Sequence, residues 1–206
     1  GSQNLMVYPI TPRALHAFAF VKISSAIPPG RPGSKVLAEK NDSLVISWAM
    51  EQGTMQADGN PAPARVATFP LPGYGSYPES VLTAEGWTFF EAAVAWLVAS
   101  PDDFIGSAAL IASNDTLSAG FDGALYDRLV SLGYDVQVVT GSDVKDGAFT
   151  IADAESKDLL VISESIGSGD IVNIKGAAVP ILHMEAFGWD KMGWQPGGNR
   201  GWTDPL

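Results

Sequence analysis

Four side chains could together supply acid–base chemistry. They are Asp115, Glu164, His183 and Glu185, and each follows a short apolar run. Carboxylates and an imidazole can exchange protons with a substrate when they converge in one pocket. The four residues are therefore the candidates for a catalytic site. Glu185 also has a second interpretation, in which its carboxylate caps a helix that begins just after it.

Polar loops that could hold a ligand follow two of these apolar runs. Residues 113–116 read Ser-Asn-Asp-Thr, and residues 163–170 are rich in serine, glycine and acidic side chains. Their hydroxyls and carboxylates could bind a sugar, another small molecule or a cation. The candidate ligand-binding residues are Asn114, Asp115, Ser165 and Ser168. Loops are also polar because they meet water, so each loop has a purely structural interpretation as well.

Other chemistry is limited by what the chain lacks. It contains no cysteine and two histidines, which excludes thiolate catalysis, disulfides and a histidine metal cluster. Residues 143–147 lack the spacing of a calcium loop and are interpreted as a turn. His16, in a strand-like run, is interpreted as a structural residue. We expect no metal site and no cofactor.

The net negative charge lies almost entirely in the second half of the chain. Residues 1–100 carry six basic and seven acidic side chains, whereas residues 101–206 carry six and sixteen. A surface of this charge repels phosphate backbones and anionic lipids. Nucleic acids and membranes are therefore not expected as partners.

Large aromatic residues mark the last part of the chain. Trp189, Trp194 and Trp202 lie among several glycines. They could offer ring faces for stacking on sugars, or they could fix a loose chain end to the core.

The elements that position these residues are clearest in the second half. Continuous apolar runs predict buried parallel strands at residues 108–112, 136–139, 159–162 and 179–182. Residues 118–132 have the apolar spacing of a helix, with Gly133 placed to end it. Strands that alternate with helical segments indicate a parallel α/β sheet.

The first half predicts a meander at the edge of this sheet, followed by one helix. Strands are expected at residues 17–23, 36–39, 44–50 and 66–71, separated by proline, glycine and asparagine turns. A helix is expected at residues 83–98, with its aromatic residues in the core. No linker interrupts the chain, so residues 1–206 are predicted to be a single α/β domain.

Two sets of segments resemble the class I glutamine-amidotransferase-like superfamily, and most closely the uncharacterised domains of this type in secreted bacterial proteins. The first set resembles the opening half of such a domain and comprises residues 108–112, 126–129 (YDRL), 133–136 (GYDV), 158–163 (DLLVIS) and 179–182 (VPIL). The second set resembles its closing half and comprises residues 64–70 (ARVATFP), 82–87 (LTAEGW) and 92–97 (AAVAWL).

The two halves stand in reversed order. Residues 1–100 resemble the family's C-terminal half, and residues 107–206 resemble its N-terminal half. The resemblance implies a flavodoxin-like parallel sheet with helices on both faces, in a circularly permuted chain. The alternative is that the chain spans parts of two tandem domains and completes itself by exchanging halves in a homodimer.

The family's glutaminase chemistry requires a cysteine nucleophile and an activating histidine. Glu185 occupies the position that resembles the nucleophile, and residues 69–72 read Phe-Pro-Leu-Pro where the histidine is expected. Glutaminase activity is therefore not expected, and whether the protein is an enzyme stays open. The resemblance implies a non-catalytic binding or structural module of a larger bacterial protein, extracellular or periplasmic. The alternatives are a hydrolase with a rebuilt carboxylate/histidine site and a carbohydrate-binding module.

Overall fold

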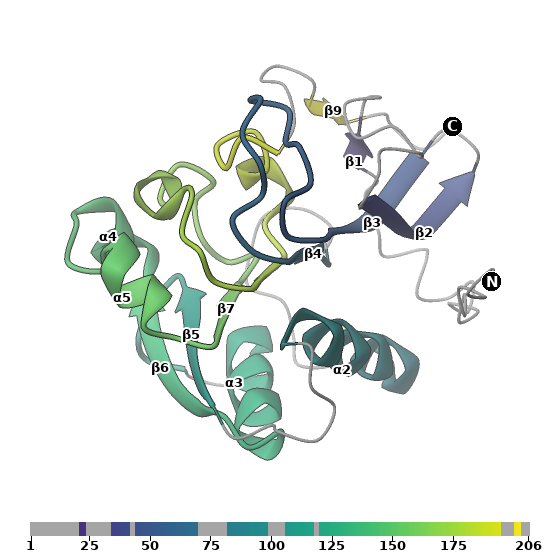
Figure 1. Cartoon of the computed structure of the whole chain (residues 1–206). Helices are drawn as coiled ribbons and strands as arrows, with labels where there is room; N and C mark the ends of the chain where they lie inside the picture. Colours follow the sequence, from purple (N-terminus) through teal and green to yellow (C-terminus); the bar gives the residue numbers. More distant parts are fainter. Residues whose placement is uncertain are drawn as a thin grey trace.

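A computed structural model describes residues 21–23, 34–41, 44–69, 82–98, 106–117, 120–194 and 200–202. The largest feature of these residues is a seven-stranded sheet (Figure 1). Its strands, in spatial order, are β2 (Ser34–Asn41), β3 (Leu44–Met50), β4 (Val66–Thr68), β8 (Ile181–His183), β7 (Leu159–Ile162), β5 (Ser107–Ala112) and β6 (Asp135–Thr140).

The strands predicted in the second half are parallel neighbours. β5 pairs in parallel with β6 on one side and with β7 on the other, and β7 pairs in parallel with β8. The prediction of four neighbouring parallel strands is confirmed. The continuous apolar runs predicted this arrangement because strands that are buried on both faces have no alternating polar side.

The first half completes the sheet, as the meander predicted. β2, β3 and β4 pair antiparallel in succession, and β4 then pairs in parallel with β8. The strand expected at residues 17–23 is described only as β1 (Val21–Ile23), which pairs with β9 (Arg200–Trp202) outside this sheet. His16 and residues 17–20 lie outside the described residues.

Helical segments cover both faces of the sheet. On one face, α2 (Ala84–Val98) and α3 (Phe121–Ser131) pack through Phe90, Leu97, Leu125 and Leu129 against residues that include Leu110 of β5. The other face is covered by α4 (Gly141–Lys145), α5 (Ile151–Glu155), η2 (Val172–Ile174) and the segment that includes Trp189. The described residues therefore form an α/β fold.

The interpretation of residues 143–147 as a turn is confirmed for residues 146–147 and wrong for the first three, which belong to α4. The Thr140 side chain accepts a hydrogen bond from the Asp143 backbone N–H, and the Asp143 carboxylate accepts one from the Thr140 N–H. This reciprocal capping box satisfies donors that a short helix otherwise leaves open. Thr150 and Asp153 make the same arrangement at the start of α5. Within the described part of the chain, no helix is long and apolar enough to cross a membrane.

Candidate functional site

Buried polar side chains gather at the carboxyl ends of three adjacent parallel strands. Two of these residues are the last residues of β4 and β8, and the other three lie just after β7 and β8. Each is at most 3% exposed, and the five are Thr68, Ser163, Glu164, His183 and Glu185. We call this set the buried polar edge. The other buried polar side chains among the described residues are Thr54 and Gln56. Because burying polar groups is costly, such a concentration marks a candidate site.

Glu185 caps the short 3-10 helix that follows β8. It is the N-cap residue of η3 (Ala186–Gly188), and its Oε1 accepts a hydrogen bond of 2.7 Å from the Phe187 backbone N–H. Its backbone has φ −77° and ψ 95°, which is an ordinary extended conformation. The capping contact that sequence analysis gave as one interpretation is therefore present.

His183 is enclosed by apolar groups at the end of β8. Its ring lies edge-on to Trp194, with ring centroids 5.1 Å apart, and Gly188 packs closely against it. Neither ring nitrogen has a hydrogen-bond partner among the described residues. Burial lowers the pKa of His183 from 6.5 to about 3, because the uncharged imidazole tolerates the loss of water better than the cation does. His183 is therefore neutral at physiological pH.

A second polar group joins the loops after β5 and β7. The Ser165 hydroxyl accepts a hydrogen bond of 3.0 Å from the Ser113 backbone N–H and donates one of 2.7 Å to Asp122. The other Asp122 carboxylate oxygen accepts a bond of 2.5 Å from the Ser163 hydroxyl. Asp122 lies in the first turn of α3. We call Ser113, Asp122, Ser163 and Ser165 the serine–aspartate cluster.

Sequence reasoning missed Asp122. The signal available was an acidic residue in the first turn of a helix that follows a predicted strand, where it also favours the helix dipole. That position alone does not reveal its partners, because Ser163 and Ser165 lie more than 40 residues away.

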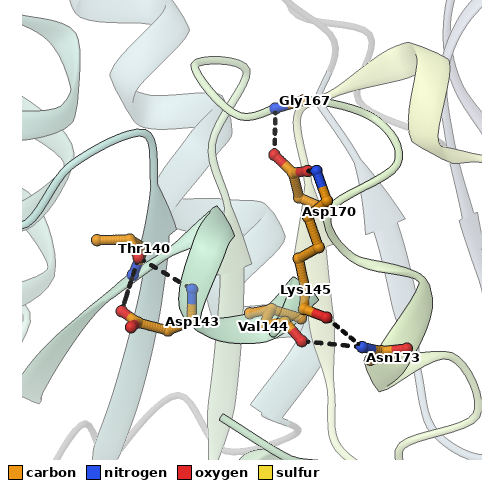
Figure 2. Close-up of polar contacts among 7 residues, drawn as sticks. All are labelled: Thr140, Asp143, Val144, Lys145, Gly167, Asp170 and Asn173. Atoms are coloured by element: carbon orange, nitrogen blue, oxygen red, sulfur yellow. Dashed lines mark hydrogen bonds and ion pairs between the residues drawn. The ribbon is translucent and has the colours of Figure 1, made fainter. Parts of the chain in front are cut away.

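The segment after β7 is also tied to α4, which directly follows β6 (Figure 2). Asp170 accepts a hydrogen bond of 3.1 Å from the Gly167 backbone N–H and lies 3.6 Å from the Lys145 ammonium nitrogen. The Asn173 side-chain amide donates to the carbonyls of Val144 and Lys145. These contacts fix the position of α4 beside the β7 loop.

The predicted site residues separate into an exposed group and a buried group. Asn114 and Asp115 are exposed, and Ser165 and Ser168 are half-buried. Glu164, His183 and Glu185 are buried. Among these residues, Ser165 has a contact that bridges two strand ends. Asn114 and Asp115 are thus presented to solvent, whereas Glu164, His183 and Glu185 are not.

The tail tryptophans are core residues where the structure describes their side chains. Trp189 and Trp194 are buried and pack in the cluster that also contains Ile162 and Ile181. Their rings therefore have no open face for a sugar. The Trp202 side chain lies outside what the structure describes.

Among the described residues, no group of three or more acidic or histidine side chains could hold a metal ion. Comparisons with protein-family models, with curated proteins and with solved structures found no match to this chain.

Proposed function

We propose that this protein is a non-catalytic, class I glutamine-amidotransferase-like domain that serves as a binding or structural module of a larger bacterial protein, outside the cytoplasm. The observation that carries the proposal is the state of Glu185, at the position that resembles the nucleophile. Its carboxylate is buried and caps η3.

The strand order supports the family resemblance. If the chain is permuted, the original domain began at β5, so β5, β6, β7 and β8 are its first four parallel strands and β4 is its fifth. Across the sheet from β6 to β4 their order is then 2-1-3-4-5, which is the flavodoxin-like order. α2 follows β4 as the closing helix of such a domain would.

The pairing of the outer strands favours permutation over an exchange of halves. β1 and β9, from the two ends of the described chain, are antiparallel neighbours. Permutation joins the original termini and opens a loop elsewhere, so the new termini lie close together, and the pairing of β1 with β9 fits this expectation. β4 also pairs with β8 of the same chain, so the two halves complete one sheet without a second copy.

The backbone at Glu185 supports the absence of nucleophilic catalysis. A nucleophile on a strand-to-helix turn needs a sharp, strained turn that exposes the reactive atom. Glu185 has an unstrained extended backbone and a buried side chain, and the chain has no cysteine.

The binding surface that fits this proposal is the region where strand order reverses. β5 lies between β6 and β7, so the loops after β5 and β7 diverge there, which is where open α/β sheets bind ligands. Asn114 and Asp115 are exposed beside the serine–aspartate cluster. Hydroxyls and carboxylates suit a small polyhydroxylated molecule or carbohydrate.

The rival hypothesis is a hydrolase rebuilt around the buried polar edge, which the burial of Glu164, His183 and Glu185 favours. One substitution distinguishes this hydrolase from a non-catalytic module. Glu185→Gln weakens the η3 cap and should lower the free energy of unfolding by about 1 kcal/mol, with sugar binding unchanged. Asp115→Asn is the opposite test, because Asp115 is exposed and belongs to the proposed binding surface: it should leave stability unchanged and weaken sugar binding.

The measurements are ammonia release from glutamine, turnover of ester, peptide and glycoside substrates, and thermal melts with and without sugars and divalent cations. Turnover by the wild-type protein that Glu185→Gln abolishes would establish the hydrolase instead.

A further inference from the structure

Residues 185–194 form a strap over the carboxyl end of β8. Trp189, Met192 and Trp194 of the strap are buried in the core, and Gly188 and Trp194 enclose the His183 ring. A methyl group on Gly188 would lie 2.9 Å from the ring carbon Cε1 of His183. The ring therefore has no room for a water molecule on the Gly188 side.

The strand side of this contact is fixed. The His183 carbonyl accepts a hydrogen bond of 3.0 Å from the Phe69 N–H, and the next residue, Met184, donates one of 2.8 Å to Ile162. β8 is held between β4 and β7 in the interior of the sheet. If the imidazole must reach water, the strap can move at lower cost than the strand.

Among the residues that the structure describes, those shown packing against the His183 ring carry no charge that could compensate one on the ring. Its register neighbours are Thr68 of β4 and Ile162 of β7, and neither ionises. From the other elements, Ile171 lies beside Gly188, and Gly188 and Trp194 face the ring; these residues do not ionise either.

The nearest carboxylates along the chain are also not bonded to the ring. Glu185 is two residues away and accepts from the Phe187 N–H, and Glu164 follows β7. Asp190, within the strap, pairs with Lys191 at 3.4 Å. Both ring nitrogens lack a hydrogen bond to any described group.

We propose that residues 185–194 are an acid-released strap: protonation of His183 detaches them from the sheet and uncovers the carboxyl end of β8. The closed strap seals Glu185 and Trp194, and the open strap presents both to solvent. This inference concerns the strap alone and does not rest on the proposed function.

The size of the response follows from proton linkage. Burial holds the pKa of His183 at about 3 in the closed state, whereas a released imidazole returns to about 6.5. Acid then favours opening, because the open state binds a proton on His183 that the closed state does not. Between pH 7 and pH 5 the equilibrium for opening should rise about 25-fold.

Hydrogen–deuterium exchange of the full chain, corrected for the intrinsic effect of pH on exchange, tests the strap directly. Protection of peptides within residues 185–194 should fall about 25-fold from pH 7 to pH 5 and should stay below the protection of β5 and β7 peptides at both pH values, because the strap opens while the sheet stays folded. His183→Leu should remove the pH dependence. His16→Leu, which removes the other histidine, is the matched control and should retain it.

Strap peptides that are as well protected as β5 peptides at both pH values, or the same pH dependence in His183→Leu, would overturn the proposal. If His183→Leu does not fold, the wild-type histidine signals in NMR decide the matter. The His183 signal should titrate between pH 6.5 and pH 3, in parallel with the loss of strap protection. A His183 signal that titrates while the strap stays protected would also overturn it.

Discussion

The serine–aspartate cluster and the buried polar edge both place polar side chains at the ends of parallel strands and share Ser163, but their other members differ in exposure and hydrogen bonding. In the cluster, Asp122 accepts hydrogen bonds from two serine hydroxyls, and the adjacent Asn114 and Asp115 stay exposed. At the buried polar edge, His183 is sealed under the strap without a hydrogen bond to a described group. A polar residue at a strand end can therefore be exposed or hydrogen-bonded, or it can be buried without a hydrogen-bond partner among the described residues, as His183 is.

The largest effect is expected when the cover of the buried polar edge is cut away. Trp189→Ala should reduce the free energy of unfolding by about 3–5 kcal/mol, because the indole is fully buried and its removal leaves a cavity. Urea denaturation at pH 7 measures this. Trp87→Ala is the control: Trp87 is half-buried on α2 and should cost less. Equal losses of stability in the two variants would contradict the expectation that the strap is packed more tightly than the surface of α2.

Acid should destabilise the protein through His183. Burial lowers the pKa of His183 to about 3 in the folded state, whereas the unfolded state has the ordinary value of 6.5. The folded state is therefore at full stability above pH 6.5, and it loses stability as pH falls toward 3, because the unfolded state binds a proton that the folded state does not. By pH 5 the loss should be about 2 kcal/mol. Urea denaturation from pH 7.5 to pH 5 measures it. His183→Leu should flatten this part of the profile, and an unchanged profile would contradict the assignment.

Asp122→Ala tests whether the serine–aspartate cluster is as well satisfied as its hydrogen bonds indicate. The substitution leaves the buried Ser163 hydroxyl without its acceptor and should cost about 1–2 kcal/mol. Asp127→Ala, at an exposed position on the same helix, should cost little. Thermal melts of both variants make the comparison, and a similar cost for the two would mean that the cluster contributes nothing to stability.

The smallest effect on stability is expected at Asp115. Asp115→Asn should change the free energy of unfolding by less than about 0.5 kcal/mol, because the side chain is exposed and its described contact is with its neighbour Thr116. Calorimetric titration with sugars and divalent cations measures any change in binding. A large loss of stability would show that the loop after β5 is structural rather than a ligand surface.

The sequence predicted those elements whose burial leaves a continuous or periodic apolar pattern. β5 and β7 were predicted within one residue because both faces of each strand are covered. α3 was recognised from the spacing of Phe121, Leu125 and Leu129, which are its buried residues. α4 and α5 were not predicted, because five residues are too few to display a helical period.

The candidate site was harder to predict, because its properties depend on residues distant in the chain. His183 stands where strand ends usually open to solvent, and it is buried because Trp194 returns over it. Asp122 gains its role from two serines on another loop. The two capping boxes, in contrast, join residues three apart and could be recognised as Thr140 with Asp143 and Thr150 with Asp153.

The packing of Asp170 against two glycines constrains the order in which these positions can evolve. A methyl group on Gly141 would lie 3.0 Å from an Asp170 carboxylate oxygen, and one on Gly167 would lie 2.8 Å from the same atom. That oxygen is held by the Gly167 backbone N–H. A side chain at either glycine therefore requires the Asp170 carboxylate to move away from the Gly167 N–H, so substitutions at these glycines should be better tolerated after position 170 has become shorter.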